Sequence, residues 1–453
     1  MSHSGPTFFS LVHRGVVTGW LIARAMALYA EVALANRGLW KPSAGTMLAR
    51  QRRFASHFVD VATRFRGGLI KIGQIASLRI DIVADEVTDE LARLQDRVEP
   101  HPFSEIAEQL ERELGTPVEA LFAHFEREPI AAASLGQVHR ARTQDGRDLA
   151  VKVLYPGVER SVAVDVAMMK IALRGFNFLS VADLLQVHAQ VKQTLLGEMD
   201  YIREGRAAEE VERNLATDPA IADHTRIPKI HWDLTTRRVL SMEYIEGCKI
   251  NDFDGLADSG VDRDELVLWA SRAFLHMMFK DGFFHCDPHP GNLLVDGAGR
   301  IGIIDFGMNQ RIDAQILDAI SRNVMATATR DSKLYASSLL DAGIIEAADV
   351  PAVIGLAELS FDPAYYNLTP TEMMNLDFGD YFKRMRVHMK KLRGFSLPNG
   401  LVMWSRAISL LYALMVELAP GIRPLDVLGP YVVEFLQRDV RLNPDVELAS
   451  KTV

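Results

Sequence analysis

The sequence predicts an α+β chain in which a small, β-rich lobe precedes a large helical lobe, with a helical extension in front of both. Two observations lead to this prediction. Strand-like alternation begins near residue 118 and returns in one later hairpin, whereas apolar residues at helical spacing fill most of the rest. We therefore divide the chain into an N-terminal extension (1–117), a small lobe (118–247), a large lobe (248–442) and a tail (443–453).

The composition is that of an ordinary globular protein, with 48% hydrophobic and 24% charged residues among 453. The formal net charge of −9 argues against general binding of nucleic acid. The two cysteines, Cys248 and Cys286, are too few for a disulfide framework or a cysteine-based zinc site. Because the chain begins without the pattern of a secretory signal, we expect a reducing, cytoplasmic environment.

The first 66 residues are expected to be helical, because Val16, Trp20, Ala23 and Ala27 recur at helical spacing. Arginine is frequent in this segment although the whole chain is acidic. Two interpretations remain open: a packed helix with a solvated basic face, or a helix that lies on an anionic membrane surface. No uncharged apolar stretch is long enough to span a membrane, and residues 407–416 are expected to form a core helix.

The segment from Phe283 to Gly307 carries the most specific pattern in the chain. Asp287 and Asn292 precede a predicted hairpin, which leads into Asp305-Phe306-Gly307. This order is typical of the catalytic loop and the metal-binding loop of a kinase, and it predicts a bilobal, protein-kinase-like fold. Phosphoryl transfer needs a carboxylate near the attacking oxygen, and oxygen ligands that hold Mg²⁺ against the phosphates. We predict that Asp287 is catalytic, that Asn292 and Asp305 are metal ligands, and that ATP and Mg²⁺ are the cofactors.

Two features argue against a protein kinase that is switched by phosphorylation. Cys286 stands where protein kinases have the arginine that binds the phosphorylated residue of the activation loop. A helix is predicted from Ile312, almost directly after Gly307, and no Ala-Pro-Glu follows. These features weaken the case for a peptide substrate.

Lys152 lies inside an otherwise apolar predicted strand, Leu149–Val153. A buried ammonium is costly without an anionic partner, so this lysine is expected to bind phosphate and a helix carboxylate. A helix predicted over residues 183–203 offers Glu198 and Asp200. We expect Glu198 to hold Lys152, which makes Lys152 and Glu198 catalytic residues together with Asp287.

An alanine-rich loop stands where kinases have a glycine-rich loop over the phosphates. Each alanine adds a Cβ and narrows the backbone choices, so the loop is expected to be stiffer and to hold nucleotide differently. The predicted nucleotide contacts come from this loop, its flanks, the strand lysine and the hinge: Ile130, Ala131, Ala132, Ala133, Ser134, Val138, Lys152, Glu243 and Ile245.

With these motifs placed, the sequence resembles the UbiB/AarF family of atypical kinase-like proteins, which is associated with ubiquinone biosynthesis and lipid metabolism. The resemblance runs from about Gly67 to Gly307 and adds an N-terminal Lys-x-Gly-Gln motif and an acidic helix motif. It implies that the extension folds over the active site, and that Lys71, Gly73, Gln74 and Asp200 form a regulatory motif that would exclude a protein substrate.

The resemblance implies an ATPase, or a kinase for a small molecule or lipid, that supports ubiquinone or other isoprenoid-lipid metabolism. Lipid, isoprenoid or phenolic molecules are the expected partners, with a peripheral contact at the inner face of a membrane and no predicted oligomeric state. Three alternatives remain: a slow nucleotide-binding regulator or lipid chaperone, a protein kinase, and a phosphotransferase resembling the aminoglycoside kinases. The Lys-x-Gly-Gln motif and the alanine-rich loop disfavour the last of these.

Overall fold

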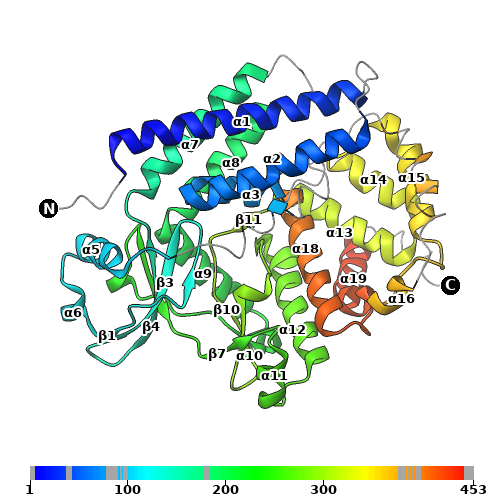
Figure 1. The fold of residues 1–453 in the computed structure, drawn as a ribbon. Coiled ribbons are helices and arrows are strands. Elements are labelled where there is room, and N and C mark those ends of the chain that lie inside the picture. Colours follow the sequence, from blue (N-terminus) through cyan, green and yellow to red (C-terminus); the bar gives the residue numbers. More distant parts are fainter. Residues whose placement is uncertain are drawn as a thin grey trace. The chain divides into compact units, whose positions relative to one another are not determined.

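The computed structural model divides the chain into two compact units (Figure 1), residues 1–206 with 229–244 and residues 207–228 with 245–453. It describes residues 6–36, 43–77, 90–91, 94, 100–176, 184–375, 381, 384–385, 387–388, 392 and 399–442. The predicted tail, residues 443–453, lies outside the described residues.

The first unit contains a five-stranded antiparallel sheet in the order β1-β3-β4-β6, with β2 paired to β3. The strands are β1 (Phe122–Phe125), β2 (Ala131–Ala132), β3 (Gly136–Thr143), β4 (Asp148–Leu154) and β6 (Val239–Glu243). Residues 230–234 make one bridge, between Ile230 and Met242, and then a 3₁₀ turn, Trp232–Leu234, in place of a strand. The Thr235 hydroxyl donates to the His231 carbonyl there, so local bonding replaces the ladder.

Helices make up the rest of the first unit. They are α1 (Phe8–Asn36), α2 (Ala44–Phe65), α3 (Gly68–Ser77), α5 (Phe103–Leu114), α6 (Val118–Leu121), α7 (Val158–Phe176), α8 (Leu184–Glu198) and the start of α9 (Tyr201–Leu215). The single helix expected over residues 183–203 is therefore two helices. The first ends at Glu198, and Asp200 caps the second, because its carboxylate accepts from the backbone N–H of Arg203 at 3.3 Å.

Within the first unit, a buried ion pair joins the N-terminal helix α1 to α7. The guanidinium of Arg14 in α1 lies 2.5 Å from the carboxylate of Asp165 in α7. It also donates to the carbonyls of Phe65 and Arg66 at the end of α2. Burial raises the pKa of Asp165 and Arg14 opposes that rise. One guanidinium therefore joins three segments that are far apart in the sequence.

The helices α1, α2 and α3 also share an apolar core, formed by Leu21, Phe58, Val59, Ala62, Leu69, Ile70, Leu91 and Leu94. Gly73 of the Lys-x-Gly-Gln motif lies in this core. A Cβ at Gly73 would lie 2.4 Å from Leu94 and 2.7 Å from Phe58, so a larger residue would push the helices apart.

The second unit holds two small sheets, one of four strands in the order β5-β10-β9-β7 and one that pairs β8 with β11. The strands are β5 (Thr225–Arg226), β7 (Gly247–Lys249), β8 (Phe283–His285), β9 (Leu293–Asp296), β10 (Ile301–Ile303) and β11 (Asn309–Arg311). The predicted hairpin after the catalytic loop is confirmed, with Leu293 opposite Ile303. The strand β7 was not predicted from the sequence.

Helices also dominate the second unit. They are α10 (Pro219–His224), α11 (Phe253–Ser259), α12 (Arg263–His276), α13 (Ala314–Thr329), α14 (Ser332–Asp341), α15 (Val350–Ser360), α16 (Pro370–Met374), α18 (Asn399–Leu418) and α19 (Pro424–Leu442). A π-helical turn, Met277–Asp281, follows α12 and leads into β8. The short distance from Gly307 to α13 is as the sequence predicts.

Within the described residues, one helix is long and apolar enough to cross a membrane, Gly400–Leu418 in α18, and a third of its apolar window is buried. Its most exposed side chains are small or polar and recur every fourth residue: Ser405, Ser409, Ala413 and Glu417. Its buried side chains include Leu411 and Leu414. This pattern is typical of an amphipathic helix that packs one face against the second unit.

Candidate nucleotide and metal site

Lys152 lies in the middle of the sheet of the first unit, where β4 pairs Lys152 with Val138 of β3 and Leu240 of β6. Its ammonium nitrogen is 2.6 Å from a carboxylate oxygen of Glu204, and both side chains are nearly buried. The ring of Tyr201 lies 5.3 Å from the same ammonium. The lysine therefore has the anionic partner that its burial demands.

The expectation that Glu198 holds Lys152 is wrong, because Glu204 takes that place. Glu204 lies in the first turn of α9, whereas Glu198 ends α8 on the other side of the helix break. A carboxylate in the first turn is also favoured by the helix dipole. The sequence analysis treated the segment as one helix and therefore chose the wrong carboxylate.

Glu198 binds the Lys-x-Gly-Gln motif instead. Its carboxylate lies 2.5 Å from the ammonium of Lys71 in α3, and both side chains are mostly buried. The expectation that this motif lies near the acidic helix motif is confirmed. Nothing is described of the side chain of Gln74, so its part in the predicted regulatory motif stays a prediction.

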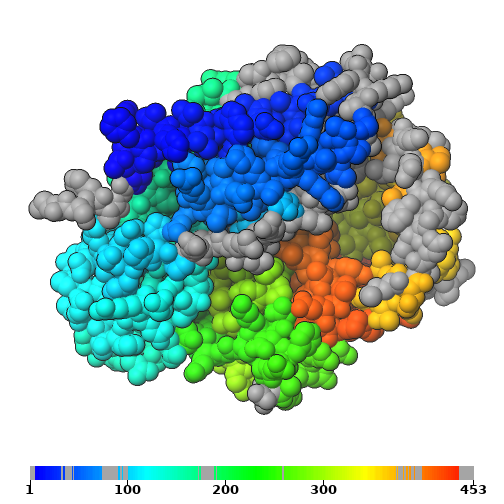
Figure 2. All heavy atoms as spheres, in the orientation of Figure 1, coloured from blue at the N-terminus to red at the C-terminus, as the bar shows by residue number. Residues whose placement is uncertain are grey.

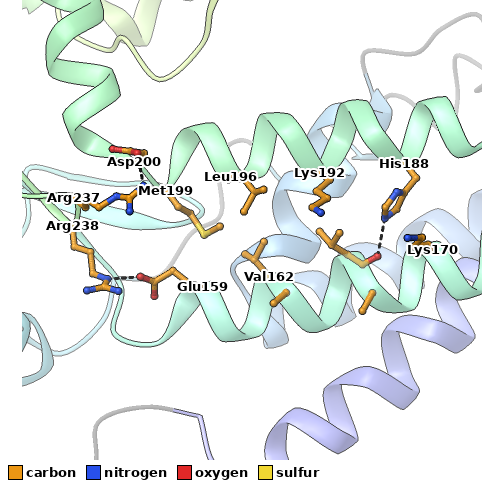
Figure 3. A pocket seen from close by; sticks show the side chains of 13 residues that line it. Glu159, Val162, Lys170, His188, Lys192, Leu196, Met199, Asp200, Arg237 and Arg238 are labelled. Atoms are coloured by element: carbon orange, nitrogen blue, oxygen red, sulfur yellow. Dashed lines mark hydrogen bonds and ion pairs between the residues drawn. The ribbon is translucent and has the colours of Figure 1, made fainter.

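Asp200, the other acidic residue of the motif, binds an arginine. Its carboxylate accepts from Arg237 at 2.9 Å. Burial opposes ionisation, but the hydrogen bonds from Arg237 and the Arg203 N–H lower the pKa of Asp200 overall. Figure 3 shows this pair at one end of a groove of about 560 Å³ between α7 and α8, with Lys192 and Lys170 towards the other end.

The alanine-rich loop is a tight hairpin between β2 and β3. Ala132 pairs with Gln137, and the backbone N–H of Ala133 donates to the Gly136 carbonyl at 2.8 Å. A Cβ at Gly136 would lie 2.4 Å from the Val153 carbonyl oxygen, so only glycine fits this crossing of backbones. Ile130, Ala131 and Ala133 are exposed, whereas Ser134 is buried.

The two predicted hinge residues fall on either side of the division between the units. Glu243 ends β6 and accepts from the backbone N–H of Lys229 at 3.3 Å. Ile245 is the first residue of the second unit's main segment and is buried beside Gly302. Their contact with nucleotide remains a prediction.

The second unit brings Asp287, Asn292 and the start of the Asp-Phe-Gly segment together. The amide nitrogen of Asn292 donates to the Asp287 carbonyl at 3.1 Å. The backbone N–H of Ile304 donates to the Asn292 carbonyl at 3.1 Å, which places Asp305 directly after this contact. The hairpin therefore brings Asp305 back beside Asn292, as the sequence predicts.

His285 links the two loops from a fully buried position. Its Nδ1 accepts from the Asp287 N–H at 3.0 Å, so its Nε2 carries the proton and donates to the Asp305 carbonyl. Burial lowers the pKa of His285, which keeps the ring neutral. The carboxylate of Asp305 accepts from the Gly307 N–H at 2.8 Å. A single tautomer of His285 therefore hydrogen-bonds to both the Asp287 loop and the Asp305 loop.

Cys286 is buried at the position where protein kinases have an arginine. Burial raises the pKa of its thiol well above the usual value. The side chain is therefore a small neutral group, and its backbone N–H donates to the Met308 carbonyl at 2.9 Å.

Arg406 is a site residue that the sequence analysis missed. It lies in α18, and its guanidinium is 2.7 Å from the carboxylate of Asp287. The two positions are far apart in the sequence, so no local pattern connects them. A signal was present nonetheless, because Arg406 interrupts an apolar helix just as Lys152 interrupts an apolar strand.

Asn292 and Asp305 fit the demands of Mg²⁺. The amide nitrogen of Asn292 is committed to Asp287, which leaves its oxygen for a metal. Across the described ranges, no cluster of three or more His, Cys, Asp or Glu residues forms a metal site. Mg²⁺ commonly uses one or two protein oxygens together with phosphates and water, so a pair of ligands suits it.

A strand lysine bound to a helix carboxylate, together with this catalytic loop and Asp-Phe-Gly segment, defines a kinase-like protein. The fold agrees: a solved structure of Rv3197 in complex with erythromycin, from Mycobacterium tuberculosis, matches with a TM-score of 0.55. That match is 24% identical and covers 83% of this chain and 95% of the other. A family model described as the ABC1 atypical kinase-like domain matches residues 93–339. The chain belongs to the ABC1/UbiB family of atypical kinase-like proteins.

Two curated relatives illustrate the family. "Protein ACTIVITY OF BC1 COMPLEX KINASE 7, chloroplastic" of Arabidopsis thaliana is 30% identical over 89% of this chain and 57% of its own length. "Probable protein kinase UbiB" of Pseudomonas aeruginosa is 32% identical over 68% of this chain and 58% of its own length. The chain thus spans little more than half the length of these relatives.

Proposed function

We propose that this chain is a Mg²⁺-dependent enzyme that transfers or hydrolyses the γ-phosphate of ATP. The buried pair of Lys152 and Glu204 carries the proposal, because it holds a lysine in mid-sheet at 2.6 Å from a helix carboxylate, which is how kinases hold the lysine that binds phosphate oxygens. Mg²⁺-ATP, when bound, would supply the phosphoryl group and the metal charge that phosphoryl transfer requires.

In this proposal each residue has a defined task. Lys152 binds phosphate oxygens, and Glu204 keeps its ammonium in place. Asp287 orients the attacking hydroxyl or water and takes its proton, while Arg406 positions the Asp287 carboxylate. Asn292 and Asp305 hold the metal.

We favour a small molecule or lipid as the acceptor over a protein. Only a short segment separates Gly307 from α13, so there is little chain to form a peptide-binding activation segment. The family resemblance implies that the N-terminal extension excludes a protein substrate, and the ion pair of Lys71 and Glu198 attaches that extension to α8. A role in ubiquinone or other isoprenoid-lipid metabolism follows only from the family association, and the relatives named protein kinases keep the protein-kinase alternative open.

We further propose a cytoplasmic location with a peripheral contact at the inner face of a membrane. The acidic chain with a basic N-terminal segment supports it.

The first test is ATP hydrolysis with Mg²⁺, for the wild type beside Asp305→Asn, with and without anionic vesicles and a phenolic quinone-precursor mimic. We expect turnover in the wild type that rises with lipid or phenol and is lost in the variant. Tight nucleotide binding without turnover under every condition would overturn the proposal. It would support the alternative of a nucleotide-binding regulator that binds ATP and barely turns it over.

A further inference from the structure

The outer face of α1 is unusual in being apolar along more than three turns. Phe8, Val12, Val16 and Trp20 recur every fourth residue and are 48% to 74% exposed, and Phe9 beside them is 83% exposed. At about 1.5 Å of rise per residue, the row is about 18 Å long. Single exposed apolar side chains are ordinary, but a continuous row of large ones marks an interaction surface.

The inner face of the same helix explains why this row points outward. Arg14 and Thr18 both bind the buried carboxylate of Asp165. Gly15 and Gly19 lie against Val164 and Met168 of α7, so the backbones approach closely on this side. The polar anchors are therefore inside and the large apolar residues are outside. The helix cannot rotate to bury the row without breaking the Arg14–Asp165 pair.

A basic row runs beside the apolar row on α2. The ring centroids of Trp20 in α1 and His57 in α2 are 5.6 Å apart, and those of His13 in α1 and Phe65 in α2 are 5.5 Å apart. These two contacts show that α2 lies antiparallel beside α1. Figure 2 shows these helices side by side on one face of the first unit. The exposed residues of α2 on the His57 side include Arg53, Asp60 and Arg64, so this edge carries two arginines against one carboxylate.

Two further features add positive charge along the same edge. Arg24 lies over the ring of Trp20, at 5.5 Å from the ring centroid. A cavity of about 490 Å³ opens beside the first turns of α1, and its charged wall residues include Arg64 and Arg66 together with one carboxylate, Glu105. The basic edge stands out because the whole chain has a net charge of −9.

We propose that α1 and α2 form a docking face for an anionic lipid bilayer, with α1 lying in the plane of the membrane surface. Phe8, Phe9, Val12, Val16 and Trp20 enter the boundary between headgroups and acyl chains, where aromatic and aliphatic side chains are favoured. The arginines at the edge bind the lipid phosphates. Within the described residues α1 is not among the helices that could span a membrane, which agrees with a helix that lies on the surface.

The inference deepens the proposed membrane contact and does not depend on phosphoryl transfer, so its test uses no nucleotide. The full chain is floated with vesicles of phosphatidylcholine alone or mixed with phosphatidylglycerol, over a range of salt concentrations. We expect binding to the anionic vesicles that weakens as salt rises. The variant Val16→Glu should lower the partition coefficient by about tenfold or more, since burial of one such side chain contributes about that factor.

A matched control distinguishes binding through this face of α1 from nonspecific binding of the protein to vesicles. Val433 in α19 is exposed to a similar degree, at 55% against 68% for Val16, so Val433→Glu should bind vesicles like the wild type. Arg53→Glu with Arg64→Glu should remove the preference for anionic lipid. Circular dichroism and melting curves of each variant establish that it is folded.

A direct reading of contact comes from Trp20, whose fluorescence should be quenched by brominated lipid in the wild type and by much less after Trp20→Phe. Absence of flotation by the folded wild type would overturn the proposal. So would a wild-type dimer in lipid-free solution that Val16→Glu converts to a monomer, because the row would then be an interface between two copies. Equal flotation of the wild type and Val16→Glu would overturn it as well.

Discussion

Two lysine–carboxylate pairs in the first unit have nearly the same geometry and different surroundings. Lys152 lies 2.6 Å from Glu204 and Lys71 lies 2.5 Å from Glu198, and all four side chains are mostly buried. The first pair joins the central strand β4 to α9, as in kinases generally, whereas the second joins α3 of the N-terminal extension to the end of α8. The same lysine–carboxylate contact can therefore serve catalysis or hold the extension in place, and the elements that it joins indicate which.

The sharpest test of that distinction is activity. Lys152→Ala should lower ATP turnover on the order of 10³-fold, because a charge aimed at the phosphates is lost. Lys71→Ala should retain turnover to within about tenfold, because Lys71 is proposed to attach the extension to α8 and not to bind the nucleotide. Steady-state ATP hydrolysis with Mg²⁺ measures both. Equal losses in the two variants would show that the second pair also serves the chemistry.

Stability tests the architectural pair. Lys71→Met should lower the free energy of unfolding by about 3 kcal/mol, because it leaves the mostly buried Glu198 without its cation. Adding Glu198→Gln should restore most of that loss, and urea unfolding of the two single variants and the double variant measures the coupling. Additive losses would mean that the two side chains act independently.

A third ion pair sharpens the comparison from the second unit. Arg406 lies 2.7 Å from Asp287, and we expect it to position the catalytic carboxylate. Arg406→Met should reduce kcat about tenfold with little change in the KM for ATP. Arg406→Lys should recover part of the loss. A rise in KM at constant kcat would instead assign Arg406 to nucleotide binding.

The smallest effect on stability is expected from a carboxylate whose partner is a histidine ring. Asp281 lies 3.7 Å from His276, and burial raises the pKa of Asp281 to about 6. This value exceeds the unfolded value of about 3.9, so the folded chain binds the extra proton between these pH values. Asp281 therefore reduces stability as the pH rises from about 4 to about 6.

Asp281→Asn removes this titration. The free energy of unfolding of the wild type, minus that of the variant, should fall as the pH rises through that window. Urea unfolding at a series of pH values measures it, and parallel curves for the two proteins would contradict the assignment.

The sequence predicted most of the site because its chemistry is local. Asp287 and Asn292 lie in one loop, and the hairpin that carries Asp305 beside them has its own turn signals. Lys152 was found because a charge inside an apolar strand demands a partner. The family resemblance supplied the Lys-x-Gly-Gln motif, which no local rule distinguishes from a helix that tolerates glycine.

The rest could not be read from local pattern in the same way. The choice between Glu198 and Glu204 depends on where a helix ends, and the capping role of Asp200 was overlooked although aspartate is among the best N-caps. Arg406 reaches Asp287 only through the tertiary fold. The outward direction of the apolar row on α1 is set by Asp165, a residue on another helix.

The bond between Arg14 and Asp165 also bears on where a shortened version of this chain can begin. The family match covers residues 93–339 and invites a shortened protein that starts there. Such a protein keeps the Asp165 carboxylate of α7 but has lost the guanidinium, hydroxyl and helix that cover it. It would expose the inner side of α7 to solvent and lose the lysine that binds Glu198. We therefore expect such a protein to be less stable than one that begins before Arg14, upstream of the residues that the family model matches.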